Sequence, residues 1–327
     1  MDMPCRLFKA MALITLACLM PAGVWAQTDV YPTKPIRLIV PFSPGAANDT
    51  IARLIGQKIG EAMGQPVIID NKAGGGGTVG ANYVAKAQPD GYTILFTNPG
   101  PGVITPLIMR EKTYSVSDFV QIIYICDAPL IIVASPAFEP KNMAELLAYA
   151  KANPGKVKFG SADAGGIPSL ALKLFQASTN TDVLAVPYKG SAETIAAVVN
   201  GTIDLVYASY ASSQTLVTAN RLRVLGVAGP KRIAAAPNVP TLAESGIANA
   251  EALVWYGLAA PRATPKAIID RINREVNNAL TLPEVKQRLG QLELEPVGGT
   301  PEEFTIVVSK EVTRVKALIK SGKLATE

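Results

Sequence analysis

Short apolar runs alternate with longer segments of helical periodicity along most of the chain. The runs at 36–40, 67–69 and 92–96 combine aliphatic, β-branched and aromatic residues, a pattern typical of strands buried on both faces. Between the first two runs, apolar residues recur at three- and four-residue spacings over 51–63, which predicts a helix. Strands separated by helices favour a doubly wound, mainly parallel sheet.

The same alternation restarts in the middle of the chain. Two apolar runs within 120–133 flank Asp127-Ala128-Pro129 and indicate a crossing into a second lobe. Further strands are expected there at 157–159, 183–186 and 203–207, whereas 223–227 is interpreted as the crossing back. Two crossings imply a hinge, with a cleft between the lobes.

The expected fold is therefore α/β with two lobes, each a doubly wound, mainly parallel sheet flanked by helices. This interpretation divides the chain into a leader at 1–26, the first part of lobe 1 at 27–125, lobe 2 at 126–226, and the completion of lobe 1 with the C-terminal helices at 227–327.

The turn after the first strand offers free backbone donors. Pro41 ends the strand because proline has no N–H for the ladder, and Gly45 permits the turn. Backbone N–H groups at the start of the next helix attract anions. A second turn of small residues at 161–166 also precedes a helix, so the two turns are expected to face each other across the cleft. Thr97 and Asn98, at the end of the third strand, are expected on the same rim.

Four charged side chains near these turns allow two interpretations each. Asp49 caps the helix or contacts a ligand, and Asp163 caps a helix or contacts an amino or hydroxyl group of a ligand. Lys189 is a counter-ion on the rim of the cleft or is simply solvated. Asp204 lies within an apolar strand segment, so it must be hydrogen-bonded if it is buried.

The glycine run at 74–77 resembles nucleotide-binding loops only superficially. A P-loop ends in Gly-Lys-Ser/Thr, whereas Thr78 and Val79 follow here. A dinucleotide fingerprint would follow the first strand, whereas this run follows the second. The run is better explained as a connection that lets a helix pack closely on the sheet.

The first residues have the features of an export signal. Arg6 and Lys9 precede an apolar core at 11–20, which is too short to span a bilayer comfortably. Val24-Trp25-Ala26 offers a small-x-small cleavage site, so cleavage after Ala26 and a periplasmic location are expected. Cys126 would then be the sole remaining cysteine, which excludes an intrachain disulfide.

Composition excludes several functional classes. The 327-residue chain has no histidine, which removes Ser-His-Asp and Cys-His catalytic systems and histidine metal sites. The net charge of +5 is dispersed without basic runs, so nucleic acid is not an expected partner. No metal or cofactor is expected. Asp49, Asp163, Asp204 and Lys189 show no recognisable catalytic spacing, so an enzyme is not expected.

Several motifs together resemble one family over nearly the whole mature chain. It is that of the periplasmic solute-binding receptors of tripartite tricarboxylate transporters, the TctC-like or Bug receptors. The motifs are Tyr31-Pro32-Thr33-Lys34-Pro35-Ile36-Arg37-Leu38-Ile39-Val40-Pro41-Phe42-Ser43-Pro44-Gly45, Asp49, Ala52-Arg53, Gly64-Gln65-Pro66-Val67, Asp70-Asn71-Lys72-Ala73-Gly74, Pro89-Asp90-Gly91-Tyr92-Thr93, Val186-Pro187-Tyr188-Lys189-Gly190 and Pro237-Asn238-Val239-Pro240-Thr241.

The resemblance implies a type II-like venus-flytrap fold that closes on a small carboxylate. Its implied role is to deliver a mono- or dicarboxylate, or an acidic amino acid, as a monomer, to the membrane permease subunits of a secondary transporter. Two other roles stay open: presenting the ligand to a sensor protein, and a periplasmic enzyme on the same fold. The full set of candidate ligand-binding residues, which includes those at the two turns and on the rim, is Phe42, Gly45, Ala46, Ala47, Asp49, Thr97, Asn98, Ser161, Asp163, Ala164, Gly165, Tyr188, Lys189, Asp204 and Ser209.

The chain departs from the family pattern at two places. The family usually has Pro-Gly-Gly where this chain has Ala46 after Gly45. Its second turn usually reads Gly-Ser-x-Gly with a histidine downstream, whereas Asp163 stands in the turn here and the histidine is absent. Both differences lie in turns that the resemblance implies to contact the two ends of the ligand.

Overall fold

The computed structural model describes residues 31–45, 47–162, 167–188, 190–248, 250–322, 324 and 326. The chain forms two compact units, Met1–Thr33 and Lys34–Glu327, and every helix and strand below belongs to the second. The leader expected at 1–26 lies outside the described residues. No helix in the described part of the chain is long and apolar enough to span a membrane.

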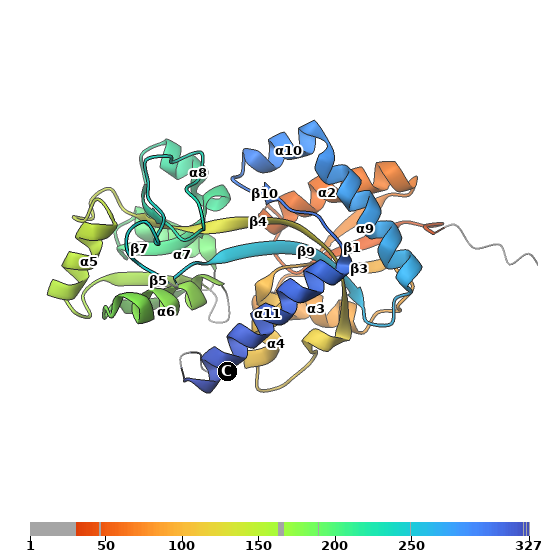
Figure 1. Cartoon of the computed structure of the whole chain (residues 1–327), viewed down its shortest axis with the longest axis horizontal. Coiled ribbons are helices and arrows are strands. Elements are labelled where there is room, and N and C mark those ends of the chain that lie inside the picture. The colour runs from red at the N-terminus through yellow and green to blue at the C-terminus, as the bar shows by residue number, and fades with distance from the viewer. Residues whose placement is uncertain are drawn as a thin grey trace, which may run out of the picture. The chain divides into compact units, whose positions relative to one another are not determined.

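One mixed sheet of ten strands runs through the unit Lys34–Glu327 (Figure 1). Three parallel strands stand at each end, and antiparallel strands join them in the middle. The order is β2 (Val67–Asn71), β1 (Ile36–Val40), β3 (Thr93–Thr97), β9 (Leu253–Pro261), β4 (Phe119–Ala134), β7 (Leu205–Ser209), β5 (Lys158–Ala162) and β6 (Leu184–Tyr188), with β8 (Arg223–Val227) and β10 (Glu295–Pro296) also paired to β4.

β4 is the strand that passes from one lobe to the other. It is 16 residues long, and it pairs with β9 as far as Pro129 and with β7 from Leu130 onward. Figure 1 shows β4 and β9 as two long ribbons linking the lobes. β4 covers the segment 120–133, in which the crossing was predicted. The two-lobed α/β fold with parallel strands in each lobe is confirmed, and β4 and β9 join the two parallel sets into one mixed sheet.

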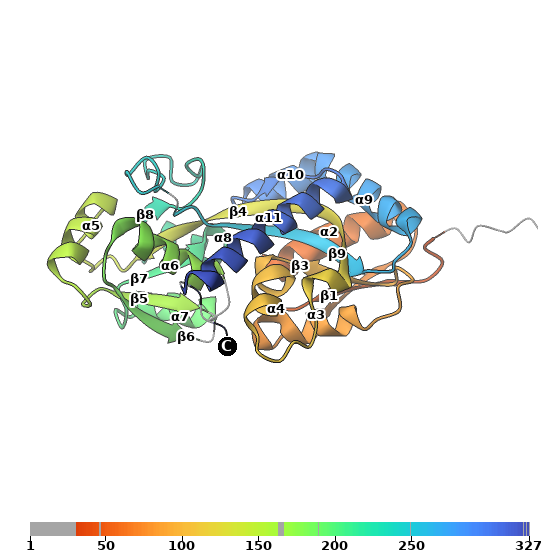
Figure 2. The ribbon, with the colours of Figure 1, turned by 60° about the horizontal axis from the view of Figure 1, so that its bottom comes forward.

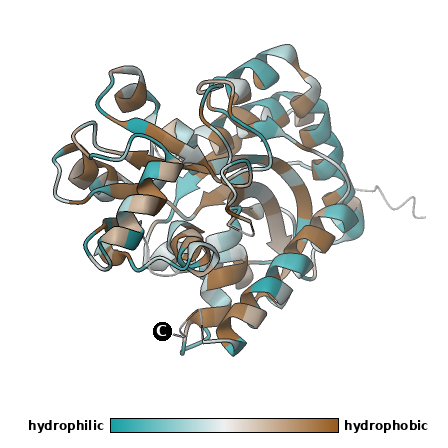
Figure 3. Ribbon diagram, turned by 60° about the vertical axis from the view of Figure 1, so that its left-hand side comes forward, coloured by the Kyte–Doolittle hydropathy of each residue, from teal (hydrophilic) through white to brown (hydrophobic). Residues whose placement is uncertain are grey.

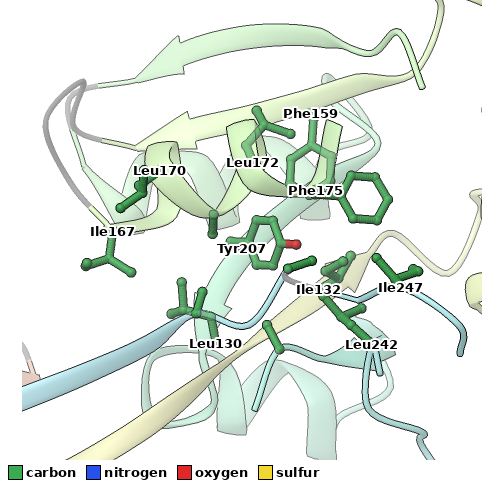
Figure 4. Close-up of a cluster of buried hydrophobic side chains, with 14 of the residues drawn as sticks. Leu130, Ile132, Phe159, Ile167, Leu170, Leu172, Phe175, Tyr207, Leu242 and Ile247 are labelled. Carbon is green, nitrogen blue, oxygen red and sulfur yellow. The ribbon is translucent and has the colours of Figure 1, made fainter. Parts of the chain in front are cut away.

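The return to lobe 1 comes later than predicted. β8, expected to cross back, instead pairs with the lobe 2 half of β4 at Ile131–Ala134. Leu242 and Ile247, which follow β8, lie close to Ile132 and Tyr207 in the lobe 2 core (Figure 4). The chain therefore returns through β9, and residues 227–252 belong with lobe 2. The predicted boundary at 226 assigned this segment to lobe 1. An apolar run in the sequence does not show which other strand it pairs with, so the error could not be seen there.

Helices cover both faces of the lobe 1 part of the sheet. α3 and α4 lie on the opposite face from α9 and α10 (Figure 2). Figure 3 shows mainly hydrophobic strands inside and hydrophilic residues on the outer turns of the helices. The lobe 1 helices are α2 (Ala47–Met63), α3 (Thr78–Ala85), α4 (Thr105–Ile108), α9 (Lys266–Thr281), α10 (Pro283–Gly290) and α11 (Pro301–Lys320); those of lobe 2 are α5 (Met143–Ala152), α6 (Ile167–Thr179), α7 (Ser191–Val199) and α8 (Tyr210–Thr218).

The glycine run after β2 serves close packing, as the sequence predicted. Gly75–Gly77 forms a short 3-10 turn that leads into α3. A Cβ on Gly77 would lie 2.9 Å from Pro101, and one on Gly80, within α3, would lie 2.8 Å from Pro41. Glycine at these positions therefore lets α3 approach the ends of the strands closely.

A second connection between the lobes lies beside β4. Glu293, just before β10, accepts backbone hydrogen bonds from Ala234 (3.0 Å) and Ala235 (2.7 Å). Ile233 is buried in the lobe 2 core, whereas β10 pairs with the lobe 1 half of β4. The Glu293 carboxylate therefore fastens a lobe 2 segment to a lobe 1 segment near the crossing.

Replacing Glu293 by alanine is expected to loosen this connection locally. The amides of Ala234 and Ala235 lose their acceptor, so their hydrogen exchange should accelerate about tenfold. Exchange in the β4 core should not change, because global unfolding does not require this contact. Glu302→Ala, an exposed carboxylate of α11, is the control and should leave both amides as they were. Equal exchange in wild type and Glu293→Ala would contradict the connection.

Candidate functional site

The carboxyl ends of the parallel strands in both lobes point toward the crossing in β4. In lobe 1, Thr97 at the end of β3 pairs with Gly257, which in turn pairs with Tyr124 of β4. In lobe 2, Ser209 at the end of β7 pairs with Leu130 of β4. Tyr124 and Leu130 are six residues apart, or about 20 Å along a strand. The carboxyl ends of the two sets of strands therefore face the same region from opposite sides.

The turn between β1 and α2, residues 41–46, is organised by the buried carboxylate of Asp49 in the first turn of α2. Its Oδ2 accepts hydrogen bonds from the backbone N–H of Gly45 (2.9 Å) and from Arg53 Nε (3.0 Å). Its Oδ1 accepts one from Asn71 Nδ2 (3.0 Å), which also donates to the Phe42 carbonyl (3.0 Å). Asp49 is 4% exposed, whereas the Arg53 side chain is 53% exposed, so the carboxylate is covered and the arginine lies at the surface. This group is named here the Asp49 network.

These contacts keep Asp49 charged. Burial raises the pKa of its carboxyl, but hydrogen bonds from Arg53, Gly45 and Asn71 outweigh burial and hold the pKa below its usual value. The carboxylate binds back onto the turn that precedes it, so it shapes the loop as well as the first turn of α2. Of its two predicted roles, the structure displays the structural one, and ligand contact stays a prediction.

The end of β3 joins the same turn. Asn98 Nδ2 donates to Asn48 Oδ1 at the start of α2 (3.0 Å), while Asn98 Oδ1 accepts from the Gly100 backbone (2.9 Å). Thr97 is 2% exposed, and its hydroxyl Oγ1 donates a hydrogen bond to the Asn98 carbonyl oxygen (3.4 Å). The prediction that Thr97 and Asn98 share a rim with the β1–α2 turn is therefore confirmed. Thr97 is too deeply buried to be reached without movement.

The lobe 2 candidates gather at the ends of β5, β6 and β7. Ser161 pairs with Pro187, and Tyr188 pairs with the last residue of β5. Ser209 begins α8, where its hydroxyl accepts a hydrogen bond from the Ser212 N–H (3.3 Å). These residues therefore stand at the edge of lobe 2 that faces the crossing. Five candidates lie outside the described residues, namely Ala46, Asp163, Ala164, Gly165 and Lys189.

Asp204 does not belong to this group. It precedes β7, and its Oδ2 accepts the Lys158 N–H at the start of β5 (2.7 Å). β5 and β7 are parallel, so Asp204 and Lys158 mark their amino ends, whereas Ser161 and Ser209 mark their carboxyl ends. The expectation that Asp204 would be hydrogen-bonded is confirmed. A strand length of about 16 Å separates Asp204 from Ser161 and Ser209, and its contact with a ligand stays a prediction.

Asn71 and Arg53 are residues of the site that the sequence did not single out. Asn71 ends β2, and Arg53 follows Asp49 by one helical turn, with Arg53 Nη2 also donating to Asn71 Oδ1 (3.3 Å). Both occur in the motifs that carried the family resemblance, but neither has an apolar pattern of its own. Asn71 could have been predicted as a site residue, because it is a polar residue at the carboxyl end of β2, where ligands of such sheets bind.

No group of three or more acidic, cysteine or histidine ligands occurs among the residues that the structure describes. Cys126 is fully buried in β4, and burial raises the pKa of its thiol. In the described part of the β1–α2 turn, the Gly45 N–H donates to Asp49, so the Asp49 network fixes the backbone of this turn.

Comparison with known proteins places these features in a family. A model of the tripartite tricarboxylate transporter family receptor (TctC) matches residues 51–324. A relative of this chain is the UPF0065 protein in the tcbD–tcbE intergenic region of a Pseudomonas species. It is 37% identical over 317 residues, covering 97% of this chain and 94% of the relative.

Two solved structures are similar over almost their whole length. The R. palustris protein Rpa4515, solved with adipate, has a TM-score of 0.84 and 32% identity, covering 90% of this chain and 99% of the other. MatC (Rpa3494) from Rhodopseudomonas palustris, solved with bound malate, has a TM-score of 0.79 and 27% identity, covering 88% and 100%. The family model, the relative and the solved structures agree. This chain belongs to the family of receptors of tripartite tricarboxylate transporters.

Proposed function

We propose that this protein is a periplasmic receptor that captures a small carboxylate between its lobes. The observation that carries this proposal is the approach of both sets of carboxyl-end turns to the crossing in β4. Ligands of open α/β sheets bind at such ends. Support comes from the two similar proteins that were solved with adipate and with malate.

In this proposal, backbone N–H groups of the two turns bind the carboxylate. Lobe 1 would contribute the N–H groups of Phe42, Ala46 and Ala47 beside Gly45, whose own N–H donates to Asp49 and so shapes the turn. Lobe 2 would contribute residues 161–165 with Tyr188 and Lys189 at the rim. Backbone donors do not titrate, so binding needs no change of protonation at neutral pH. A ligand that reaches both turns gains its full set of contacts only when the lobes close, and this difference drives closure.

The proposed destination of the ligand is a membrane permease of the tripartite tricarboxylate type. A leader cleaved after Ala26 would place the receptor in the periplasm, beside the membrane that holds the permease. There the receptor would act as a monomer. The protein would release the ligand unchanged, since the chain has no histidine and the described acidic residues form no catalytic pair.

Thermal shift with the mature chain tests the ligand class. Adipate and malate should be compared with adipamide, which has the length of adipate but no charge. At a concentration about 100 times the dissociation constant, a ligand specific for the folded state adds ~2.7 kcal/mol, or about 5 °C in Tm for a chain of this size. We expect a shift with at least one dicarboxylate and none with adipamide. Equal Tm shifts with adipate and with adipamide would refute the proposal. Turnover of the bound acid, followed by NMR, would also refute it.

A further inference from the structure

A buried turn follows β3 and lies outside the fifteen candidate ligand residues. Residues Gly100–Ile104 form a single π-helical turn, in which the N–H of Thr105 bonds to the Gly100 carbonyl. All five residues are buried. Turns of this kind are uncommon and frequently occur at functional sites. The segment is named here the π turn, and it begins three residues after Thr97, the last residue of β3.

The π turn holds Asn98 on the rim of the site. The Gly100 N–H donates to Asn98 Oδ1 (2.9 Å), and the Gly102 N–H donates to the Asn98 carbonyl (2.9 Å). Asn98 Nδ2 in turn donates to Asn48 Oδ1 in the first turn of α2 (3.0 Å). The position of the π turn therefore determines where the rim meets the start of α2.

Gly102 is the point at which the π turn approaches the strands of the crossing. A Cβ at this position would lie 2.7 Å from Thr97 Oγ1 and 3.0 Å from Cη2 of the Trp255 indole. Ordinary contacts between such atoms are about 3.5–4.0 Å, so only glycine fits without displacement. Trp255 belongs to β9 and pairs with Asp127 of β4, two residues before that pairing ends at Pro129. The crossing and the rim therefore meet at Gly102.

Packing, not hydrogen bonding, fixes the indole of Trp255. The side chain is 4% exposed, and its Nε1 has no hydrogen-bond partner among the residues that the structure describes. A buried donor without a partner costs free energy, so the N–H does not account for a tryptophan here. The Phe304 ring packs edge-on against the indole, with the ring centres 5.2 Å apart. The bulk of the indole is thus what the π turn meets.

Pro101 ties the π turn to two further segments. The Tyr114 hydroxyl donates to the Pro101 carbonyl (2.8 Å), and a Cβ on Gly77 would lie 2.9 Å from the Pro101 ring. Close-packed interiors transmit strain, because they have little space to absorb it. With Pro101 held, a displacement at Gly102 passes to Asn98 on the rim.

We infer that Trp255 and Gly102 are positioning residues of the carboxylate site. Their contact sets the position of the π turn, and the π turn sets the bond between Asn98 and Asn48 at the start of α2. Neither Trp255 nor Gly102 needs to touch the ligand. The inference rests on the proposed function, since the arrangement of the rim affects binding only if the site holds a ligand.

The test changes the volume at this contact and measures binding of the best dicarboxylate by calorimetry. Gly102 has no positive φ, so Gly102→Ala changes only the contact, and affinity should fall about tenfold. Trp255→Phe removes part of the indole and should weaken binding about fivefold. Both variants act on one contact, so the double variant should bind within about twofold of Gly102→Ala rather than about 50-fold more weakly than wild type.

A matched variant and a second measurement separate positioning from a loss of stability. Gly290 of α10 has open space where a Cβ would stand, so Gly290→Ala should bind within about twofold of wild type. Without ligand, the Gly100 amide of Gly102→Ala should exchange its hydrogen faster, by about tenfold more than amides of the lobe 2 half of β4. A loss of stability alone would accelerate both sets equally.

Four outcomes would overturn the inference. These are unchanged affinity in Gly102→Ala, an equal loss in Gly290→Ala, losses that add in the double variant, and equal acceleration of the Gly100 and β4 amides. If wild type bound no dicarboxylate, the proposed function would be refuted instead. Exchange of the Gly100 amide in the unliganded protein would still decide whether the contact positions the rim.

Discussion

Replacing Asp49 by alanine is expected to weaken carboxylate binding about 100-fold and to lower the free energy of unfolding by about 2–3 kcal/mol. The substitution leaves Arg53, Asn71 and the Gly45 N–H without the acceptor that they share. The β1–α2 turn then loses the contacts that hold its backbone donors in one arrangement. A ligand must pay for ordering the turn as it binds, which costs affinity beyond the loss of stability.

Two further variants separate this effect from a simple loss of charge. Asp270→Ala removes an exposed carboxylate that pairs with Lys266 four residues away, and it should change stability by no more than about 0.5 kcal/mol. Asp49→Asn retains one acceptor oxygen, so its effect should lie between those of Asp49→Ala and wild type. Isothermal titration with the best carboxylate and urea unfolding provide the two readouts. Unchanged affinity in Asp49→Ala would show that the network does not shape the site.

Replacing Phe304 by alanine is expected to cost about 3–5 kcal/mol of stability, the largest effect of any single change considered. Phe304 is 1% exposed and projects from α11 onto the two strands that join the lobes. Its ring lies edge-on to Trp255 of β9, with centres 5.2 Å apart, and 5.5 Å from Tyr124 of β4. A Cβ on Gly257 would collide with the same ring. The cavity left by alanine therefore opens beside the crossing.

Ile306 provides a matched control two residues along the same helix. It is 54% exposed, so Ile306→Ala should change stability by less than about 0.5 kcal/mol. Trp255 is the sole tryptophan after Trp25, so its fluorescence reports unfolding of the mature chain from beside the cavity. Similar urea midpoints for Phe304→Ala and Ile306→Ala would contradict the packing described for α11.

Local pattern was sufficient to predict the alternation of strands and helices, and the crossing as well. β4 contains two apolar runs that flank Asp127-Ala128-Pro129, and each run has few alternatives as a buried strand. β8 shows where local pattern fails. Its residues would suit a buried strand in either lobe, and only pairing with Ile131–Ala134 assigns it to lobe 2. Pairing between distant segments leaves no periodicity in the sequence.

The candidate site divides along the same line. The β1–α2 turn and the Thr97–Asn98 rim followed from the rule that ligands bind at the carboxyl ends of strands. The same rule would have excluded Asp204, which precedes its strand. Asn71 and Arg53 were missed because their role depends on meeting Asp49 in space, across 22 and four residues of chain. A side-chain network of this kind is visible only once the fold is known.

Hydrogen exchange with and without a bound dicarboxylate tests the central claim most directly. If both lobes close on the ligand, amides of the β1–α2 turn and amides following β5 and β6 should be protected together at saturation. Peptides covering α10 should not change, since the ion pair of this helix with α2 is at Lys58, nine residues beyond Asp49. Protection in one lobe alone, or in neither, would contradict the account of a carboxylate held between two sets of backbone donors.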